Sequence, residues 1–366
     1  MRWSKAKEDR PELFRKRVAN PLRLLFPCKL LWHWISHRLH LTRSSPSSDR
    51  TEDQVASSLV SGLICGSSPR FRSQDQTLYF VDMFGKKVLR FSLTTEDVGV
   101  VYEDAEDFVS SIGWLPDGRM LIVRMKSRQV LVLDQAASSV ELYADVSTVT
   151  QFRANDVVVA ASGRVYLSNA GFDFAKMKRC CTTTLVSIDP VDRQVRVEAT
   201  DLLLPNGMVI TPDGKTLVVA ETLAGRLTAF HIDENGKLIN RRVWANVGTL
   251  LGGISLDTEG CIWTSVQQLG VYPATGVVRV KEGGKIMNLL GFQRNGISRR
   301  VHACTLGLDA TGTDPRLYFI ESLACHETTV LMQGHRTARQ NSALKIIRIP
   351  VGPALMSTNK NYCGGH

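Results

Sequence analysis

Six positions along the chain place polar or small residues at the start of similar apolar segments. They are Ser67, Ser110, Asn155, Asn206, Gly252 and Gly307. Hydroxyl and amide groups donate and accept hydrogen bonds, so such a set suits a small polar ligand. Because equivalent points of a closed repeat gather around its axis, we expect these six residues to meet at one end of a central channel.

The two asparagines and a nearby arginine each allow a second interpretation. Asparagine tolerates left-handed backbone geometry and bonds to local backbone, so Asn155 and Asn206 could instead serve turns. We favour the channel, because the repeat puts both at the same point. Arg153 stands two residues before Asn155, a spacing that places both side chains on one side of a strand. Arg153 therefore either shares the ligand pocket or lies on the surface.

The repeat that positions these residues is clearest in the stretch 202–227. An apolar run, 208–211, is followed by Pro212-Asp213-Gly214-Lys215 and by a second apolar run, 217–220. Proline presets one turn dihedral and glycine tolerates positive φ. The stretch therefore predicts two strands joined by a tight turn.

Copies of this unit recur along the chain. Their second strands start at Leu78, Met120, Val165, Leu217, Ile262 and Leu317, at spacings of 42, 45, 52, 45 and 55 residues. Such periods are typical of propeller blades, each a four-stranded sheet. We therefore predict an all-β fold, a six-bladed β-propeller whose first strands line the channel. The second strands should end in a wider ring of Asp82, Arg124, Asn169, Glu221, Val266 and Glu321. A last strand, 344–349, is expected to close the ring against the first blade.

Charge is distributed unevenly over the 366 residues. The net charge is +10, but residues 1–58 alone hold 12 Lys or Arg against 6 Asp or Glu. The repeats contain no basic stripe interleaved with aromatic residues, so we predict no nucleic-acid partner. We divide the chain into a basic, disordered extension (1–58), a propeller (59–352) and a C-terminal tail (353–366).

The N-terminal extension contains an apolar stretch, 21–41, that is interrupted by charges and by a proline. The interruptions argue against a transmembrane span or a secretory signal. An amphipathic helix at a membrane surface and a mitochondrial presequence are the alternatives to disorder. The eight cysteines show no paired metal-binding spacing. We interpret them as reduced thiols of a cytoplasmic protein.

From about residue 63 to residue 351 the sequence resembles the senescence marker protein/regucalcin/gluconolactonase family, especially its bacterial-type lactonases. The matching stretches are SSPRF (67–71), LYFVDMFGKKVLR (78–90), SIGWLPDGRMLIV (111–123), RANDVVVAASGRVYLSNAGFDF (153–174), LLPNGMVITPDGKTLVVAETLAGRLTAFHID (203–233), NRRVWANVG (240–248) and GISLDTEGCIW (253–263). The resemblance implies a propeller with a divalent metal, Ca²⁺ or Zn²⁺, in its channel. It also implies hydrolysis of a sugar lactone or a related lactone.

The resemblance assigns roles to individual residues. Asn206 matches a metal-ligating asparagine, and Arg153 and Asn155 match a pair that helps to hold substrate. Ser67 and Gly252 stand where the family has two carboxylate ligands. Hard cations need anionic oxygen ligands, so the metal is expected to be weakly bound or absent. An enzyme whose metal matters should gain activity when carboxylates are restored at these two positions.

The general base of the family coincides with Gly252, so no catalytic residue is assigned. Four carboxylates could compensate: Asp82, Asp156, Glu221 and Glu321. The first three lie within family-like motifs and could instead simply hold strand ends and turns. His302, five residues before Gly307, is interpreted as a loop histidine. The main functional hypothesis is a lactone hydrolase. The alternatives are a non-catalytic propeller that binds a small polar ligand or a protein, and metal-independent chemistry as in strictosidine-synthase-like proteins.

Overall fold

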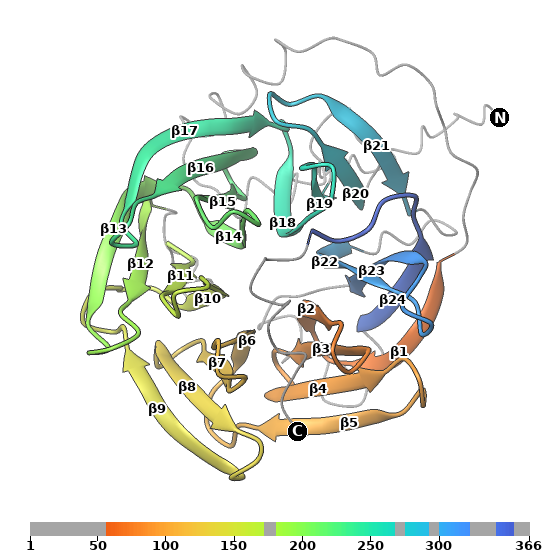
Figure 1. Cartoon of the computed structure of the whole chain (residues 1–366), viewed down its shortest axis with the longest axis horizontal. Helices are drawn as coiled ribbons and strands as arrows, with labels where there is room; N and C mark the ends of the chain where they lie inside the picture. The colour runs from red at the N-terminus through yellow and green to blue at the C-terminus, as the bar shows by residue number, and fades with distance from the viewer. Residues whose placement is uncertain (1–55, 172–180, 268–274, 293–299, 323–341, 355–366) are drawn as a thin grey trace, which may run out of the picture.

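The computed structural model describes residues 56–171, 181–267, 275–292, 300–322 and 342–354. Within these ranges the regular elements are β-strands, which form six four-stranded antiparallel sheets. The sheets stand as blades around a central axis (Figure 1), which confirms the predicted six-bladed β-propeller. The N-terminal extension, apart from its last three residues, lies outside the described residues.

The innermost strands, in order around the ring, are β2, β6, β10, β14, β18 and β22 (Figure 1). In chain order the strands are β1 (Ser57–Leu63), β2 (Gly66–Arg72), β3 (Thr77–Asp82), β4 (Lys87–Ser92), β5 (Val98–Glu103), β6 (Val109–Trp114), β7 (Met120–Arg124), β8 (Gln129–Asp134), β9 (Ser139–Asp145), β10 (Ala154–Val159), β11 (Val165–Asn169), β12 (Thr183–Ile188), β13 (Val195–Leu202), β14 (Pro205–Ile210), β15 (Thr216–Glu221), β16 (Arg226–Ile232), β17 (Leu238–Asn246), β18 (Leu250–Leu256), β19 (Ile262–Gln267), β20 (Thr275–Val280), β21 (Ile286–Gly291), β22 (Arg300–Leu308), β23 (Pro315–Ser322) and β24 (Ser342–Arg348).

The hairpin of β14 and β15 has the turn that its sequence predicts. The Asp213 Oδ1 atom accepts bonds from the Thr211 hydroxyl at 2.6 Å and from the Lys215 N–H at 3.0 Å. Gly214 has a φ of 72°, in the left-handed region where a side chain would be strained. These bonds close the turn and set the register of the two strands, with Ile210 opposite Leu217.

The hydrophobic core is divided among the six junctions between neighbouring blades. In one cluster Leu121 of β7 packs with Leu167 of β11, so the second and third blades share it. The other five junctions have corresponding clusters. Both faces of the second strands are therefore covered, which explains why they read as continuous apolar runs rather than alternating ones.

The sixth blade is completed by the beginning of the described chain. Its strand order is β1-β24-β23-β22, so β1 pairs with β24 on the outer side. Val60 and Leu63 of β1 are buried in the cluster between the sixth and first blades. The predicted last strand, 344–349, corresponds to β24 and lies inside this blade. The strand that closes the ring is therefore β1, which the sequence had not identified.

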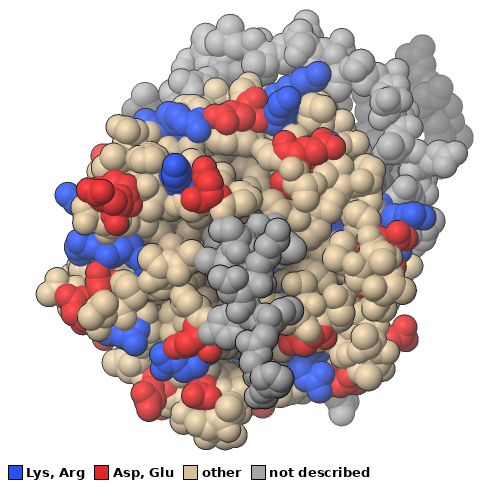
Figure 2. Space-filling model, viewed as in Figure 1, with Lys and Arg blue, Asp and Glu red and all other residues tan. Residues whose placement is uncertain are grey.

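Within the described ranges, no helix is long and apolar enough to cross a lipid bilayer. On the face shown in Figure 2, acidic and basic side chains are interspersed around the rim.

Deletion of residues 1–63 should destabilise the propeller far more than deletion of residues 1–55. The longer deletion removes β1, and losing the burial of Val60 and Leu63 alone costs about 3–6 kcal/mol. Thermal unfolding of the two truncated proteins, followed by circular dichroism, measures the difference. Equal unfolding midpoints would contradict closure of the ring by β1.

Candidate functional site

All six inner strands contain a β-bulge near the same end of the channel. In β14 and β15, Pro205 lies opposite Glu221 and Met208 opposite Val219, so the inner strand holds one residue more than its partner. The other five inner strands have the same one-residue excess. A bulge turns a side chain away from the regular ladder. We call this end of the channel the mouth, defined by Ser67, Ser110, Asn155, Asn206, Gly252 and His302.

Five of these mouth residues were predicted from the sequence, and the sixth was not. The bulge of β22 lies between Val301 and Ala303, so His302 takes the sixth position. The prediction of Gly307 is wrong: Gly307 lies near the other end of β22, against the Phe71 side chain. The sixth hairpin is longer than the others. Counting back from Leu317 by the spacing found in the other five hairpins therefore gives a position too late in β22. His302 is accordingly a strand residue and not a loop histidine.

The two asparagines lie side by side at the mouth. The Asn155 Nδ2 atom donates to the Pro205 carbonyl oxygen at 3.1 Å, which ties it to the strand that carries Asn206. The Asn206 Nδ2 atom donates to the Thr222 hydroxyl at 3.3 Å. No contact within the described part of the chain uses either amide oxygen. As far as the described residues are concerned, both oxygens are available to accept hydrogen bonds from a ligand.

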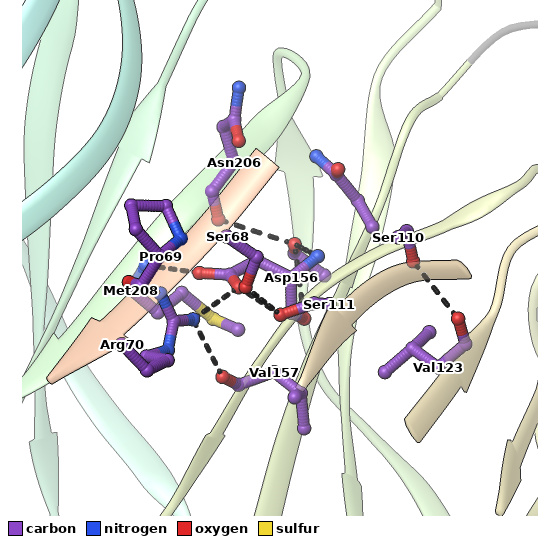
Figure 3. A network of polar contacts seen from close by, with 12 residues as sticks. Ser68, Pro69, Arg70, Ser110, Ser111, Val123, Asp156, Val157, Asn206 and Met208 are labelled. Atoms are coloured by element: carbon purple, nitrogen blue, oxygen red, sulfur yellow. Dashed lines mark hydrogen bonds and ion pairs between the residues drawn. The ribbon is translucent and has the colours of Figure 1, made fainter. Parts of the chain in front are cut away.

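Asp156 forms the centre of a buried network next to the mouth (Figure 3). Its Oδ1 atom accepts from the Ser111 hydroxyl and from Arg70 Nη2, both at 2.6 Å, and its Oδ2 atom accepts from the Met208 N–H at 3.0 Å. The Ser68 hydroxyl lies 2.8 Å from the Ser111 hydroxyl. Because Ser111 donates to the carboxylate, Ser68 donates to Ser111. The network joins the inner strands of four blades.

Asp156 is consequently a structural group. Its side chain is about one-tenth exposed, and both carboxylate oxygens accept hydrogen bonds from strands that surround it. Ser68 and Ser111 are also buried. In Figure 3 the side chain of Asn206 points away from this network, which separates the buried polar centre from the mouth.

The carboxylates of the wider ring also have structural partners. Asp82 accepts from the N–H groups of Ile64 at 3.0 Å and Cys65 at 2.8 Å. Glu321 lies 3.6 Å from the ammonium of Lys345, on the neighbouring strand of its blade. Both carboxylates lie near strand ends, which for Asp82 is the second interpretation from the sequence.

Glu221 is the most completely paired of these carboxylates. It accepts from the Arg226 guanidinium at 2.8 Å, from the Thr228 hydroxyl at 2.5 Å and from the Leu203 N–H at 3.0 Å. Burial raises the pKa of Glu221, but these hydrogen bonds outweigh burial and hold the pKa below its ordinary value. Glu221 is therefore ionised and fully engaged at neutral pH.

The residues at the mouth do not fit a divalent metal. Among the described residues, no group of three or more His, Cys, Asp or Glu is placed to hold a metal ion. The side-chain oxygens at the mouth come from amides and hydroxyls, which carry no charge to balance a dication.

Arg153 comes directly before β10. Its backbone carbonyl accepts from the Ala170 N–H at 2.9 Å, and its Nη1 atom lies 3.9 Å from the Met125 sulfur. These contacts place Arg153 at the same end of the blade as Asn155. Its role in holding a ligand stays a prediction.

One cysteine departs from the predicted reduced state. Cys65 is disulfide-bonded, whereas Cys181, Cys261 and Cys304 are thiols, so the partner of Cys65 is not among the described residues. Burial raises the pKa of the Cys304 thiol to about 12, which keeps it protonated. The interpretation of all cysteines as reduced is wrong for Cys65, and a cytoplasmic location stays a prediction.

Comparison with known proteins identifies the family. Residues 65–311 match the SMP-30/Gluconolactonase/LRE-like region, which is more than half of the chain. The chain belongs to the SMP-30/gluconolactonase/LRE-like family. Regucalcin of Danio rerio is 26% identical over 219 residues, which cover 58% of this chain and 72% of that protein.

Two solved structures of proteins with related names have the same fold. A calcium-binding regucalcin from Agrobacterium tumefaciens has a TM-score of 0.64 at 17% identity, covering 83% of this chain and 96% of the other. A gluconolactonase from Xanthomonas campestris has a TM-score of 0.61 at 21% identity, covering 82% and 91%. Family membership supports a lactonase-type function in general.

Replacement of Glu221 by Gln should lower stability at neutral pH and have less effect in acid. The folded-state pKa is depressed, so the contribution of the carboxylate is present above its unfolded pKa of about 4.3 and is lost as the pH falls through the folded pKa. Loss of the charge at pH 7 should cost about 2–4 kcal/mol, since the partly exposed arginines retain some solvation. Urea unfolding at pH 7 and pH 3 measures both values.

Glu282→Gln is the matched control, because Glu282 forms an exposed pair with Arg242. It should change stability little at either pH. An equal loss at pH 7 and pH 3 in Glu221→Gln would contradict the assigned role of the Glu221 charge.

Proposed function

We propose that this chain binds a lactone or a related small polar molecule at the mouth and opens the lactone ring there. Membership of a lactonase family supports the reaction class. The observation that carries the proposal is the pair of available amide oxygens on Asn155 and Asn206, fixed by bonds from their own NH₂ groups. Such oxygens accept bonds from ligand hydroxyls, and Arg153 is the candidate donor to the ligand carbonyl.

Hydrolysis also needs a group that takes a proton from water. Among the six mouth positions, His302 is the titratable one. In the proposed reaction a water oxygen attacks the lactone carbonyl carbon, the His302 imidazole accepts the water proton, and the ring C–O bond breaks. The departing oxygen takes that proton back from the His302 imidazolium, which gives a hydroxy acid and restores the neutral imidazole. In this scheme protein side chains at the mouth hold the ligand and the attacking water, and no metal ion takes part.

A second candidate function is binding without catalysis. The absence of carboxylate side chains at Ser67 and Gly252 favours it, because these are the positions at which the family resemblance places its metal and base. Such a propeller would use the same mouth for a small polar ligand, with no change to the ligand.

Proton release from a panel of γ- and δ-lactones tests the first candidate. The native protein should release acid, and Asn206→Leu should lower kcat/KM by about 10–100-fold through loss of a ligand hydrogen bond. His302→Gln should lower kcat by about 10²–10⁴-fold with little change in KM. Asn288→Leu, on the outer strand β21, is the matched control and should behave as the native protein.

Two outcomes separate the candidates. A native protein that releases no acid, but whose unfolding temperature rises with lactone, would contradict hydrolysis and support binding. Full activity in His302→Gln would contradict the role of His302.

A further inference from the structure

We infer that the mouth is a metal-independent site, because the fifth and sixth blades have closed over the position at which the family resemblance places a carboxylate ligand. The ligand it takes is an uncharged, hydroxyl-bearing small molecule, bound directly by amide oxygens. The inference rests on the proposed function only for the location of the ligand, since it concerns what the mouth can hold and not whether a lactone is opened.

Gly252 has no room for any side chain. A Cβ atom on this residue would overlap the carbonyl oxygen of His302 and the hydroxyl of Ser265. That hydroxyl itself donates to the His302 carbonyl at 3.1 Å. Side chains can rotate away from a clash, but the carbonyl belongs to the backbone of β22. A carboxylate at position 252 therefore requires β18 and β22 to move apart.

Neighbouring glycines show the same close approach of inner strands. A Cβ atom on Gly253 would lie 2.6 Å from the Cβ of Ala303, and one on Gly207 would lie 2.6 Å from the Ile254 nitrogen. Real Cβ atoms essentially never come within 3.0 Å of such neighbours. Glycine thus allows β14, β18 and β22 to pack backbone against backbone. The packing of three blades therefore depends on the absence of a side chain at position 252.

In the part of the chain that the structure describes, the carboxylates near the mouth have partners of their own. Asp156 is surrounded by donors from other inner strands, and Glu221 by two arginines, a hydroxyl and an N–H group. A dication held by the six described mouth residues would meet neutral oxygens, which compensate poorly for the loss of its hydration shell. The same neutral acceptors suit the hydroxyl groups of an uncharged ligand. Restoring both carboxylates is therefore not expected to restore a metal site, contrary to the expectation from the sequence.

Thermal unfolding of the full chain with Ca²⁺, Mn²⁺ or Zn²⁺, and then with EDTA, tests the inference without any lactone. The unfolding temperature of the native protein should not change with metal or chelator. A chelator-reversible rise that disappears in Asn206→Leu would overturn the inference. A rise that persists in Asn206→Leu would place the ion away from the mouth and would leave the inference standing.

Glycine variants test the closure itself. Gly252→Ala should lower the unfolding temperature by roughly 2–8 °C, because overpacking forces the inner strands apart. Gly113→Ala is the matched control on another inner strand: its added Cβ would meet neighbours at 3.4 Å, which is ordinary contact. It should leave the unfolding temperature nearly unchanged. Equal stability of both variants would contradict the closure.

Gly252→Asp makes the comparison sharper. It should be at least as unstable as Gly252→Ala and should not gain metal binding, alone or with Ser67→Glu. A double variant of native stability that binds Ca²⁺ by calorimetry would overturn the inference. Neither result depends on lactone hydrolysis, so failure of the proposed reaction and failure of this inference are separately visible.

Discussion

The carboxylate of Asp156 holds together the side of the ring on which the candidate site is built. It accepts bonds from three inner strands while it is itself part of a fourth, so one buried charge sets the spacing of four blades. Removing a partner from such a group leaves a buried charge or donor uncompensated, which is costly in a low-dielectric interior. Asn155 directly precedes Asp156, and Asn206 lies two residues before Met208. The position of both amides at the mouth thus depends on this one network.

The opposite side of the ring is held in a different way. There the inner strands β14, β18 and β22 approach closely at Gly207, Gly252 and Gly253, where a side chain would overlap a neighbouring strand. Polar bonding on one side and close backbone packing on the other produce a mouth that is neutral and asymmetric. In this the site differs from the metal centre that the family resemblance implies, which would have carboxylate ligands at positions 67 and 252.

Much of this architecture follows from local sequence patterns. The turn chemistry around Asp213 and Gly214 and the repeated apolar runs predict hairpins, and their spacing predicts six blades. The position of His302 does not follow, because the sixth hairpin is longer and only the strand pairing shows where its bulge lies. The importance of Gly252 was visible as a missing carboxylate. The close packing around Gly252 was not visible, because His302 and Ser265 are far from Gly252 in the sequence and come next to it only in the folded chain.

The most direct test of a metal-independent mouth is anomalous scattering from crystals grown with millimolar Mn²⁺. We predict no anomalous peak within coordinating distance of the Asn206 amide oxygen, with β18 and β22 still in contact at Gly252. A peak at that oxygen, with ligands around it, would contradict the central claim and would show that the mouth binds a metal ion.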